Sequence, residues 1–124
     1  MEIALIHPQQ LFANHPALAK GRHCYLIEDP LIFGNDTRWP LAIHKQKLVL
    51  HRASMQAYAA ELMGMGHEVS HIENPGSPTV DSVQLLDQSL PQGLRVIHIA
   101  DPEDDVIMKR LRRLARDRDA DRIR

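Results

Sequence analysis

Three short, mostly apolar runs that end close to a proline constrain the fold of this chain most strongly. The runs are Ile3–Ile6, Cys24–Ile27 and Val96–Ala100, and the prolines that follow them are Pro8, Pro30 and Pro102. Strands buried on both faces have this pattern in parallel sheets, where helices cover each side. The shorter and more polar run Val69–Ile72 is expected at an edge of the same sheet.

Helical spacing of apolar residues fills the intervals between these runs. It predicts a long helix over about 43–65, ended by Gly64 and Gly66, and a shorter helix over about 79–90. The last helix is expected to begin at Asp101, whose side chain can cap free N–H groups ahead of Pro102. A short helix is expected between the first two runs, and a long loop over 31–40.

Strands that alternate with helices predict an α/β fold. We expect a Rossmann-like three-layer sandwich with a mostly parallel sheet in the strand order 3-2-1-4. Residues 1–118 are assigned to this single domain and residues 119–124 to a charged tail, interpreted as a frayed helix end.

The composition excludes several classes of protein. A net charge of -1 argues against a dedicated nucleic-acid binder, and Cys24 alone can form neither an internal disulfide nor a cysteine-ligated cluster. No run is long enough to span a membrane, so we expect a cytoplasmic chain without a membrane partner. No G-x-G-x-x-G or G-x-x-x-x-G-K-[ST] motif occurs, and the spacings of the histidines do not favour a metal site.

Ligands of open α/β sheets bind beyond the carboxyl ends of the strands, where the strand order reverses. Gln9 and Gln10 follow the first strand, Glu28 the second and Asp101 the fourth. The two amides can donate and accept at the edge of a heterocycle, or they can simply open a helix.

Two further features admit both a functional and a structural interpretation. A basic face that includes Lys45 opens the long helix and fits an anionic ligand tail, an acidic partner surface or a solvated face; it comprises His44, Lys45, Lys47, His51 and Arg52. Phe33 and Trp39 share the long loop, where they could line a site or cover the end of the sheet.

Four stretches, taken together and in order, resemble one known family. They are Pro8–Leu11, Tyr25–Gly34, His44–Met55 with its His-Lys-x-Lys start, and Asp101–Leu114 with its Asp-Pro-x-Asp-Asp start. They resemble the photolyase-related proteins of the cryptochrome/photolyase superfamily, the prokaryotic (6-4) photolyases and iron–sulfur bacterial cryptochromes. The resemblance covers essentially the whole chain, but only the amino-terminal α/β domain of the family.

This resemblance implies an antenna chromophore, often a ribityllumazine or a flavin-like ring, in the α/β domain. In full-length relatives a larger helical domain holds FAD, the iron–sulfur cluster and the damaged DNA. We therefore expect light-dependent DNA repair, a lyase reaction, or photoreception only in a full-length parent, and no repair chemistry from this chain alone. The chain is either a fragment of such a parent or a stand-alone domain.

The leading hypothesis is thus a photolyase-like α/β domain that binds a small aromatic chromophore. Gln9, Gln10 and Glu28 are expected to make polar contacts, with Leu11 and Ile32 lining the pocket and Lys45 and Asp101 beside it. One alternative is a chromophore-free module that docks a partner or the helical FAD domain. A third possibility is a free-standing nucleotide-binding protein that resembles the universal stress proteins.

Overall fold

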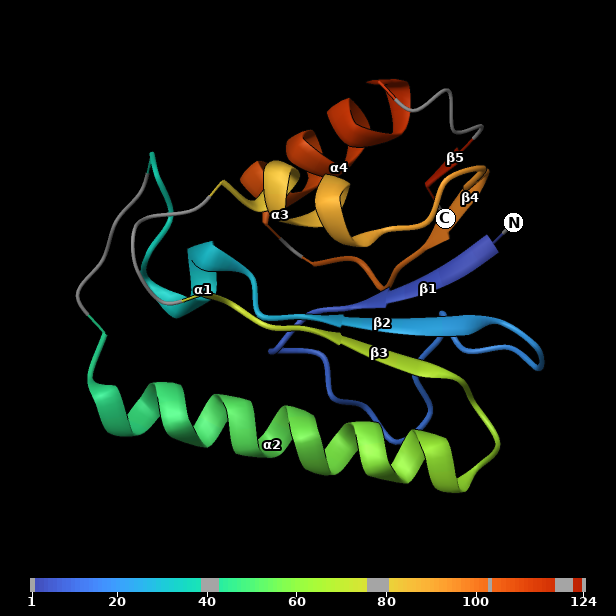
Figure 1. Cartoon of the computed structure of the whole chain (residues 1–124), viewed down its shortest axis with the longest axis horizontal. Coiled ribbons are helices and arrows are strands. Elements are labelled where there is room, and N and C mark those ends of the chain that lie inside the picture. Colours follow the sequence, from blue (N-terminus) through green and yellow to red (C-terminus); the bar gives the residue numbers. More distant parts are fainter. Residues whose placement is uncertain (1, 39–42, 76–80, 103, 118–121, 124) are drawn as a thin grey trace.

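The computed structural model describes residues 2–38, 43–75, 81–102, 104–117 and 122–123. Its centre is a five-stranded sheet in which all paired strands are parallel, in the order β3-β2-β1-β4-β5 (Figure 1). The strands are β1 (Glu2–Ile6), β2 (His23–Ile27), β3 (Val69–Ile72), β4 (Val96–His98) and β5 (Arg122–Ile123). The predicted α/β fold and the order of the first four strands are confirmed, as is the edge position of Val69–Ile72.

Helices cover both faces of the sheet and complete three layers. The long helix α2 (Lys45–Gly64) lies on one face, whereas α3 (Ser82–Ser89) and α4 (Asp105–Asp117) lie on the other (Figure 1). None of the helices within the described residues is long and apolar enough to cross a membrane.

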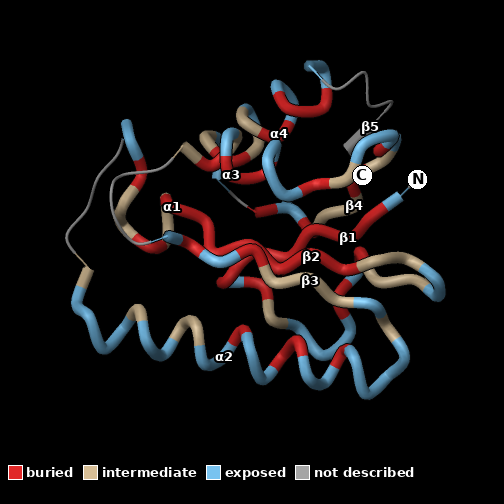
Figure 2. The backbone as a smooth tube through the Cα atoms, viewed as in Figure 1, coloured by how far each residue is buried: buried red, intermediate tan, exposed pale blue. Residues whose placement is uncertain are grey.

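The alternation of side chains along β1 explains why both faces are covered. Ile3 and Leu5 belong to the core cluster under α3 and α4, and Ala4 and Ile6 to the cluster under α2. All four residues are fully buried, and Figure 2 shows β1 as buried along its length except at its first residue, which is exposed. Full burial of a Leu or Ile side chain contributes about 1.5–3 kcal/mol, so a single short strand anchors both layers.

The end of the chain differs from the expected frayed helix. β5 pairs with β4 in parallel, with Arg122 opposite Val96 and Ile123 opposite Ile97. The other residues of the predicted charged tail lie outside the described part of the chain.

The prediction of a short helix between the first two strands is wrong. Residues 7–22 form turns instead, because Pro16 lacks the N–H that a helix needs and its ring would clash with the preceding turn. Side chains satisfy this backbone: the Tyr58 hydroxyl donates to the carbonyl of Phe12 at 2.7 Å, and Arg22 donates to the carbonyl of Ala17 at 2.6 Å.

The long loop predicted over 31–40 contains a single helical turn, α1 (Pro30–Phe33). The Asp29 side chain accepts from the N–H of Leu31 at 2.9 Å and so caps this turn, which ends at Gly34 with φ 85°. The sequence Asp29-Pro30 therefore starts a helical turn, as the sequence Asp101-Pro102 was expected to do. Trp39 lies outside the described residues.

The last helix begins later than predicted. Asp104, and not Asp101, accepts from the N–H groups of Val106 and Ile107, at 2.9 and 3.1 Å. Asp104 is the capping residue nearer to the buried stripe that begins at Ile107, so the helix starts where packing against the sheet begins. α2 and α3 start at Lys45 and Ser82, within the predicted ranges; residues 79 and 80 are outside the described part.

Candidate functional site

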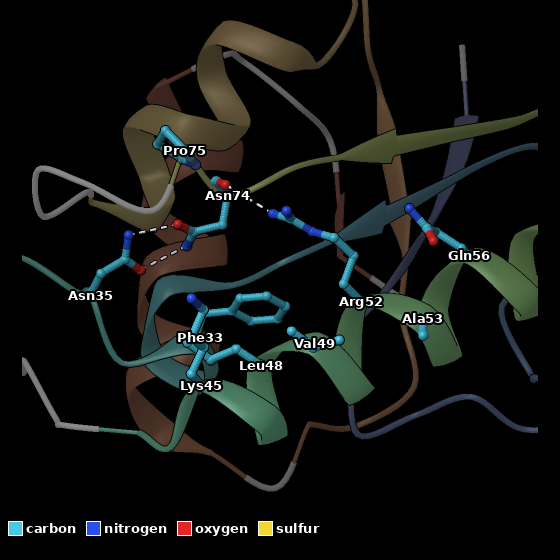
Figure 3. A pocket seen from close by; sticks show the side chains of 10 residues that line it. All are labelled: Phe33, Asn35, Lys45, Leu48, Val49, Arg52, Ala53, Gln56, Asn74 and Pro75. Atoms are coloured by element: carbon cyan, nitrogen blue, oxygen red, sulfur yellow. Dashed lines mark hydrogen bonds between the residues drawn. The ribbon is translucent and has the colours of Figure 1, made fainter.

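A pocket of about 370 Å³ lies beyond the carboxyl ends of β2 and β3, against the first half of α2. α1 supplies Phe33 and the loop after it supplies Asn35, while Asn74 and Pro75 come from the segment after β3 (Figure 3). α2 supplies the remaining lining residues, Lys45, Leu48, Val49, Arg52, Ala53 and Gln56. We call this the α1–α2 pocket.

The buried carboxylate of Glu28 organises one side of the pocket from beneath. It is completely buried at the end of β2 and accepts from Arg52 Nε at 2.8 Å, from the N–H of Asn74 at 2.7 Å, and lies 2.9 Å from His71 Nε2. Burial alone would raise the pKa of Glu28, but the hydrogen bonds from Arg52 and Asn74 outweigh it and lower that pKa below its usual value. Glu28 is therefore a carboxylate that holds other groups in place.

Arg52 connects the buried Glu28 carboxylate to the surface of the pocket. Its guanidinium donates to both carboxylate oxygens of Glu28 and, at 3.1 Å, to the carbonyl of Asn74, while its side chain stays 41% exposed. The hydrogen bond to Glu28 raises the pKa of Arg52. The pocket thus contains a positive charge whose position is set from below.

Two amides form the polar rim. Asn35 Nδ2 donates to Asn74 Oδ1 at 2.6 Å, and Asn74 Nδ2 donates to Asn35 Oδ1 at 2.7 Å (Figure 3). This reciprocal pair joins the loop after α1 to the loop after β3. It places amide groups next to Arg52 at one end of the pocket.

The opposite side of the pocket is apolar. The ring of Phe33 is 8% exposed and lies 6.0 Å from the imidazole of His51 between centroids. Leu48 and Val49 extend this wall along α2 (Figure 3), and Val49 is 62% exposed. An apolar wall facing a few fixed polar groups is the usual composition of a site for a small, planar organic ligand.

The predicted site residues fall into two separate places. Lys45 lines the α1–α2 pocket and Glu28 holds Arg52 beneath it. Ile32 and Leu11 are partly buried and pack against the core cluster under α2. The structure does not bring Gln9, Gln10 or Asp101 to this pocket.

Those three residues lie beyond the carboxyl ends of β1 and β4. Gln9 is exposed, whereas Gln10 is buried and its Nε2 donates to the carbonyls of Ala100 and Asp101, at 3.2 and 3.0 Å. The Gln10 amide therefore joins the two loops at the switch point, and the backbone of Asp101 serves as its acceptor. The side chain of Asp101 is exposed.

The basic face predicted on α2 is divided among several roles. His44 caps the helix, with its Nδ1 accepting from the N–H of Gln46 at 3.1 Å. His51 lies against Phe33, Arg52 is paired with Glu28, and Lys47 is exposed. Lys45 is the member of this face that lines the pocket without an ion pair to any described residue.

A buried His–Asp pair next to this region was not found from the sequence. His7 Nε2 and Asp29 Oδ2 lie 3.7 Å apart, and both side chains are almost completely buried. Burial, and then the charge of His15, lower the pKa of His7 to about 4, while burial raises the pKa of Asp29 to about 6. His7 is the first residue after β1 and Asp29 the second after β2, so the rule that placed Gln9 and Glu28 could have identified them.

Asn35 and Asn74 were also missed. Asn74 follows β3 by two residues and could have been proposed from its position alone. Asn35 could not, because its partner is 39 residues away in the chain. Among the described residues, no group of three or more His, Cys, Asp or Glu side chains is arranged to hold a metal ion.

Comparison with known proteins supplies the remaining information. No curated protein matches the chain significantly. A family model, deoxyribodipyrimidine photo-lyase-related protein, matches residues 4–123, which include the pocket and every strand except the first two residues of β1. The chain therefore belongs to the deoxyribodipyrimidine photo-lyase-related family.

Proposed function

We propose that this chain is a photolyase-related α/β domain that binds a planar heteroaromatic antenna chromophore in the α1–α2 pocket. One observation carries the proposal: a pocket of about 370 Å³ has an apolar wall at Phe33, Leu48 and Val49 and a polar end held by buried Glu28. A ring can lie against the apolar wall while its heteroatoms accept from Arg52 or exchange hydrogen bonds with amides.

The geometry of the pocket supports a particular class of chromophore, the one that the family resemblance implies. A ribityllumazine or flavin-like ring has carbonyl and ring-nitrogen acceptors along one edge and a hydroxylated chain at the other. Arg52 suits such acceptors because guanidinium is a rigid, permanently charged donor. Exposed Lys45 at the start of α2 suits an anionic or hydroxylated tail.

The wider role is an extension of this proposal. As the amino-terminal domain of a longer photolyase-related protein, the chain would pass light energy to an FAD in a helical domain. That domain would also hold the iron–sulfur cluster and the damaged DNA. A cytoplasmic location accords with this role.

Two matched substitutions on α2 test the proposal. Val49 and Leu50 are neighbours with similar exposure, 62% and 66%, but only Val49 lines the pocket. With 6,7-dimethyl-8-ribityllumazine as the probe, we expect Val49→Trp to weaken binding about tenfold or more by filling the pocket. Leu50→Trp should bind as the unmodified chain does. Equal affinity of all three proteins, or no binding by any, would contradict the proposal.

The exposed apolar residues of α2 favour a second candidate function. Val49 and Leu50 are exposed. They belong to α2, which carries exposed residues along its length while its buried residues pack against the sheet (Figure 2). Under this alternative the domain holds no chromophore, and the α2 surface docks the helical FAD domain. Leu50→Glu would then weaken association with that domain, and the lumazine titration would show no binding.

A further inference from the structure

A second pocket, of about 390 Å³, lies along α4 on the other side of the sheet from α2. Among the described residues six line it, of which five are cations and none is acidic: Arg38, Val106, Lys109, Arg110, Arg113 and Arg116. We call it the basic pocket. Charges on a helix surface are commonly just solvated, but the clustering of these cations around a concave site calls for a different explanation.

The spacing of α4 explains how the cations come together. Ile107, Leu111 and Leu114 form the buried stripe that packs on the sheet. Residues 106, 109, 110, 113 and 116 recur at intervals of three or four and therefore share an adjacent face. From 109 to 116 the helix rises by roughly 10 Å, so the cations extend over several ligand atoms.

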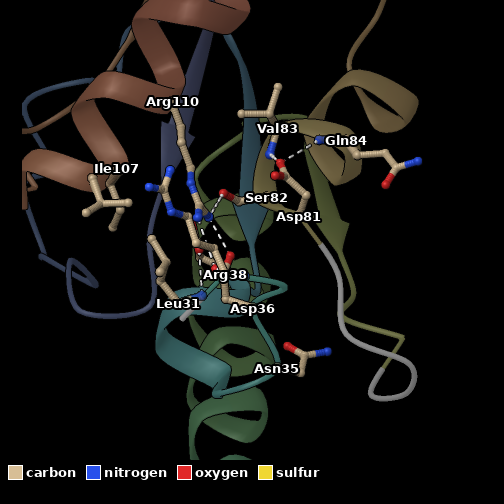
Figure 4. A network of polar contacts seen from close by, with 12 residues as sticks. Leu31, Asn35, Asp36, Arg38, Asp81, Ser82, Val83, Gln84, Ile107 and Arg110 are labelled. Carbon is tan, nitrogen blue, oxygen red and sulfur yellow. Dashed lines mark hydrogen bonds and ion pairs between the residues drawn. The ribbon is translucent and has the colours of Figure 1, made fainter. Parts of the chain in front are cut away.

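A buried carboxylate links the helix to the loop that closes the pocket. Asp36 is fully buried and accepts from both terminal nitrogens of Arg110, with Nη2 at 3.0 Å (Figure 4). The N–H of Arg38 also donates to Asp36, at 3.0 Å, and Arg110 Nη1 donates to the Ser82 hydroxyl at 2.8 Å. These bonds bring the loop with Arg38 against α4 and set the shape of the pocket.

The ion pairs at the pocket leave two of its cations, Lys109 and Arg113, without a carboxylate partner among the described residues. Asp36 offsets Arg110, and exposed Asp117 lies 3.9 Å from Arg116. Within the part of the chain that the structure describes, neither Lys109 nor Arg113 forms an ion pair. Arg113 also borders a neighbouring surface that carries acidic Asp81, Asp87 and Asp117. That surface limits the ligand to the side of Lys109 and Arg38.

We propose that the basic pocket binds closely spaced phosphate groups. Guanidinium forks match phosphate oxygens with paired hydrogen bonds, and Lys109 adds a point charge. The site uses charged side chains, which accords with the absence of a glycine-rich phosphate loop from the sequence. Such groups occur in a nucleoside triphosphate and along a nucleic-acid backbone. The proposal is independent of the chromophore site, which lies on the opposite face of the sheet.

The probes are inorganic tripolyphosphate, adenosine triphosphate, a short single-stranded oligonucleotide and citrate, each titrated calorimetrically into the full chain. We expect tripolyphosphate to bind and citrate, a multiply charged carboxylate, to bind at least about tenfold more weakly. An oligonucleotide that binds much more tightly than the triphosphate identifies the backbone as the source of the phosphates. The reverse order identifies a small phosphorylated ligand.

Removing single charges inside and outside the pocket distinguishes a specific phosphate site from attraction by the overall charge of α4. Arg112 and Arg113 are both exposed on α4, but only Arg113 lines the pocket. We expect Arg113→Gln, and likewise Lys109→Gln, to weaken tripolyphosphate binding about tenfold, and Arg112→Gln to change it less than about twofold. Circular dichroism checks that each variant is folded. Equal losses for Arg112→Gln and Arg113→Gln, equal binding of citrate, or no phosphate binding at low salt would overturn the proposal.

Discussion

Arg52 of α2 and Glu28 at the end of β2 form a two-point ion pair whose carboxylate is completely buried and whose guanidinium is 41% exposed. The same carboxylate accepts from the backbone of Asn74 after β3. One buried charge therefore joins a strand end, a helix and a loop that together form one side of the α1–α2 pocket. The stability of this region and the shape of the pocket are expected to depend on the same contacts.

Replacing Arg52 tests this dependence. We expect Arg52→Gln to lower the free energy of unfolding by about 2 kcal/mol, because Glu28 keeps its bonds to Asn74 and His71 but loses its cation. Lys47→Gln removes one charge from an exposed site on the same helix. It should change the free energy of unfolding by less than about 0.5 kcal/mol. Urea denaturation of both variants at neutral pH makes the measurement. Similar small losses would show that the ion pair contributes little.

The buried pair His7 and Asp29 predicts two opposing effects of pH on the free energy of unfolding. The pKa of folded His7, about 4, lies below its ordinary 6.5, so its contribution to stability is lost as the pH falls from about 6.5 towards 4. The pKa of folded Asp29, about 6, lies above its ordinary 3.8, so its contribution is lost as the pH rises through that range. The two effects oppose each other in the unmodified chain.

Single substitutions should separate the two effects. Relative to the unmodified chain, Asp29→Asn should lose stability on acidification from pH 6 to 4, and His7→Gln should gain it, each by up to about 1.4 kcal/mol per pH unit. Asparagine can still accept from Leu31, so the cap of α1 is kept. Urea denaturation at a series of pH values measures the differences, with the exposed Glu61→Gln as the control. Parallel curves for all variants would show that the pair does not titrate as described.

Local sequence signals were sufficient for the strands and the approximate positions of the longer helices. Continuous apolar runs mark strands buried on both sides, and β1 is such a strand, with Ile3 and Ala4 on opposite faces. For residues 7–22, Pro16 is a local signal against a continuous helix, but the turns that form instead depend on distant partners. The Tyr58 hydroxyl, which satisfies the carbonyl of Phe12, is 46 residues away. Periodicity carries no information about such a bond.

The candidate site was predictable only in part for the same reason. The strand-end rule found Glu28, and the charge pattern found Lys45 and Arg52. The pocket also requires the pairing of Asn35 with Asn74 across 39 residues, and no spacing reveals it. The same strand-end rule predicted that Gln10 contacts a ligand. In the structure the Gln10 amide joins the loops after β1 and β4.

The proposed role also predicts what the chain cannot do alone. With added FAD and ultraviolet-damaged DNA under blue light, we expect no reversal of the lesion. Repair requires an excited reduced flavin next to a flipped-out base, and pockets of about 370 and 390 Å³ on opposite faces do not enclose both. Chromatography of the digested DNA gives the amount of lesion. A light-dependent loss above that of a sample without protein would overturn the expectation.

Gln9 and Gln10 provide a matched pair for the crevice between β1 and β4. Gln10→Ala should lower the free energy of unfolding by about 1–3 kcal/mol, because the carbonyls of Ala100 and Asp101 lose a buried donor. Gln9→Ala, at an exposed position, should change it by less than about 0.5 kcal/mol. Neither should alter chromophore affinity if the ligand occupies the α1–α2 pocket. A loss of affinity without loss of stability in Gln10→Ala would move the site to this crevice.

Substitutions of Lys45 and Lys47 can show whether an anionic ligand contacts one lysine or is attracted by the overall positive charge at the start of α2. Both are exposed, two residues apart on the same helix, and only Lys45 lines the pocket. Near the amino end of a helix the dipole disfavours cations, so helix stability gives no reason for a lysine there. With a phosphorylated flavin as the anionic probe, Lys45→Gln should weaken binding by about 1 kcal/mol at low salt, and less at high salt, while Lys47→Gln should have little effect. Fluorescence quenching of the flavin measures both affinities. Equal losses for the two variants would show that the helix attracts the anion only through its overall charge, and an unchanged affinity in Lys45→Gln would remove this lysine from the site.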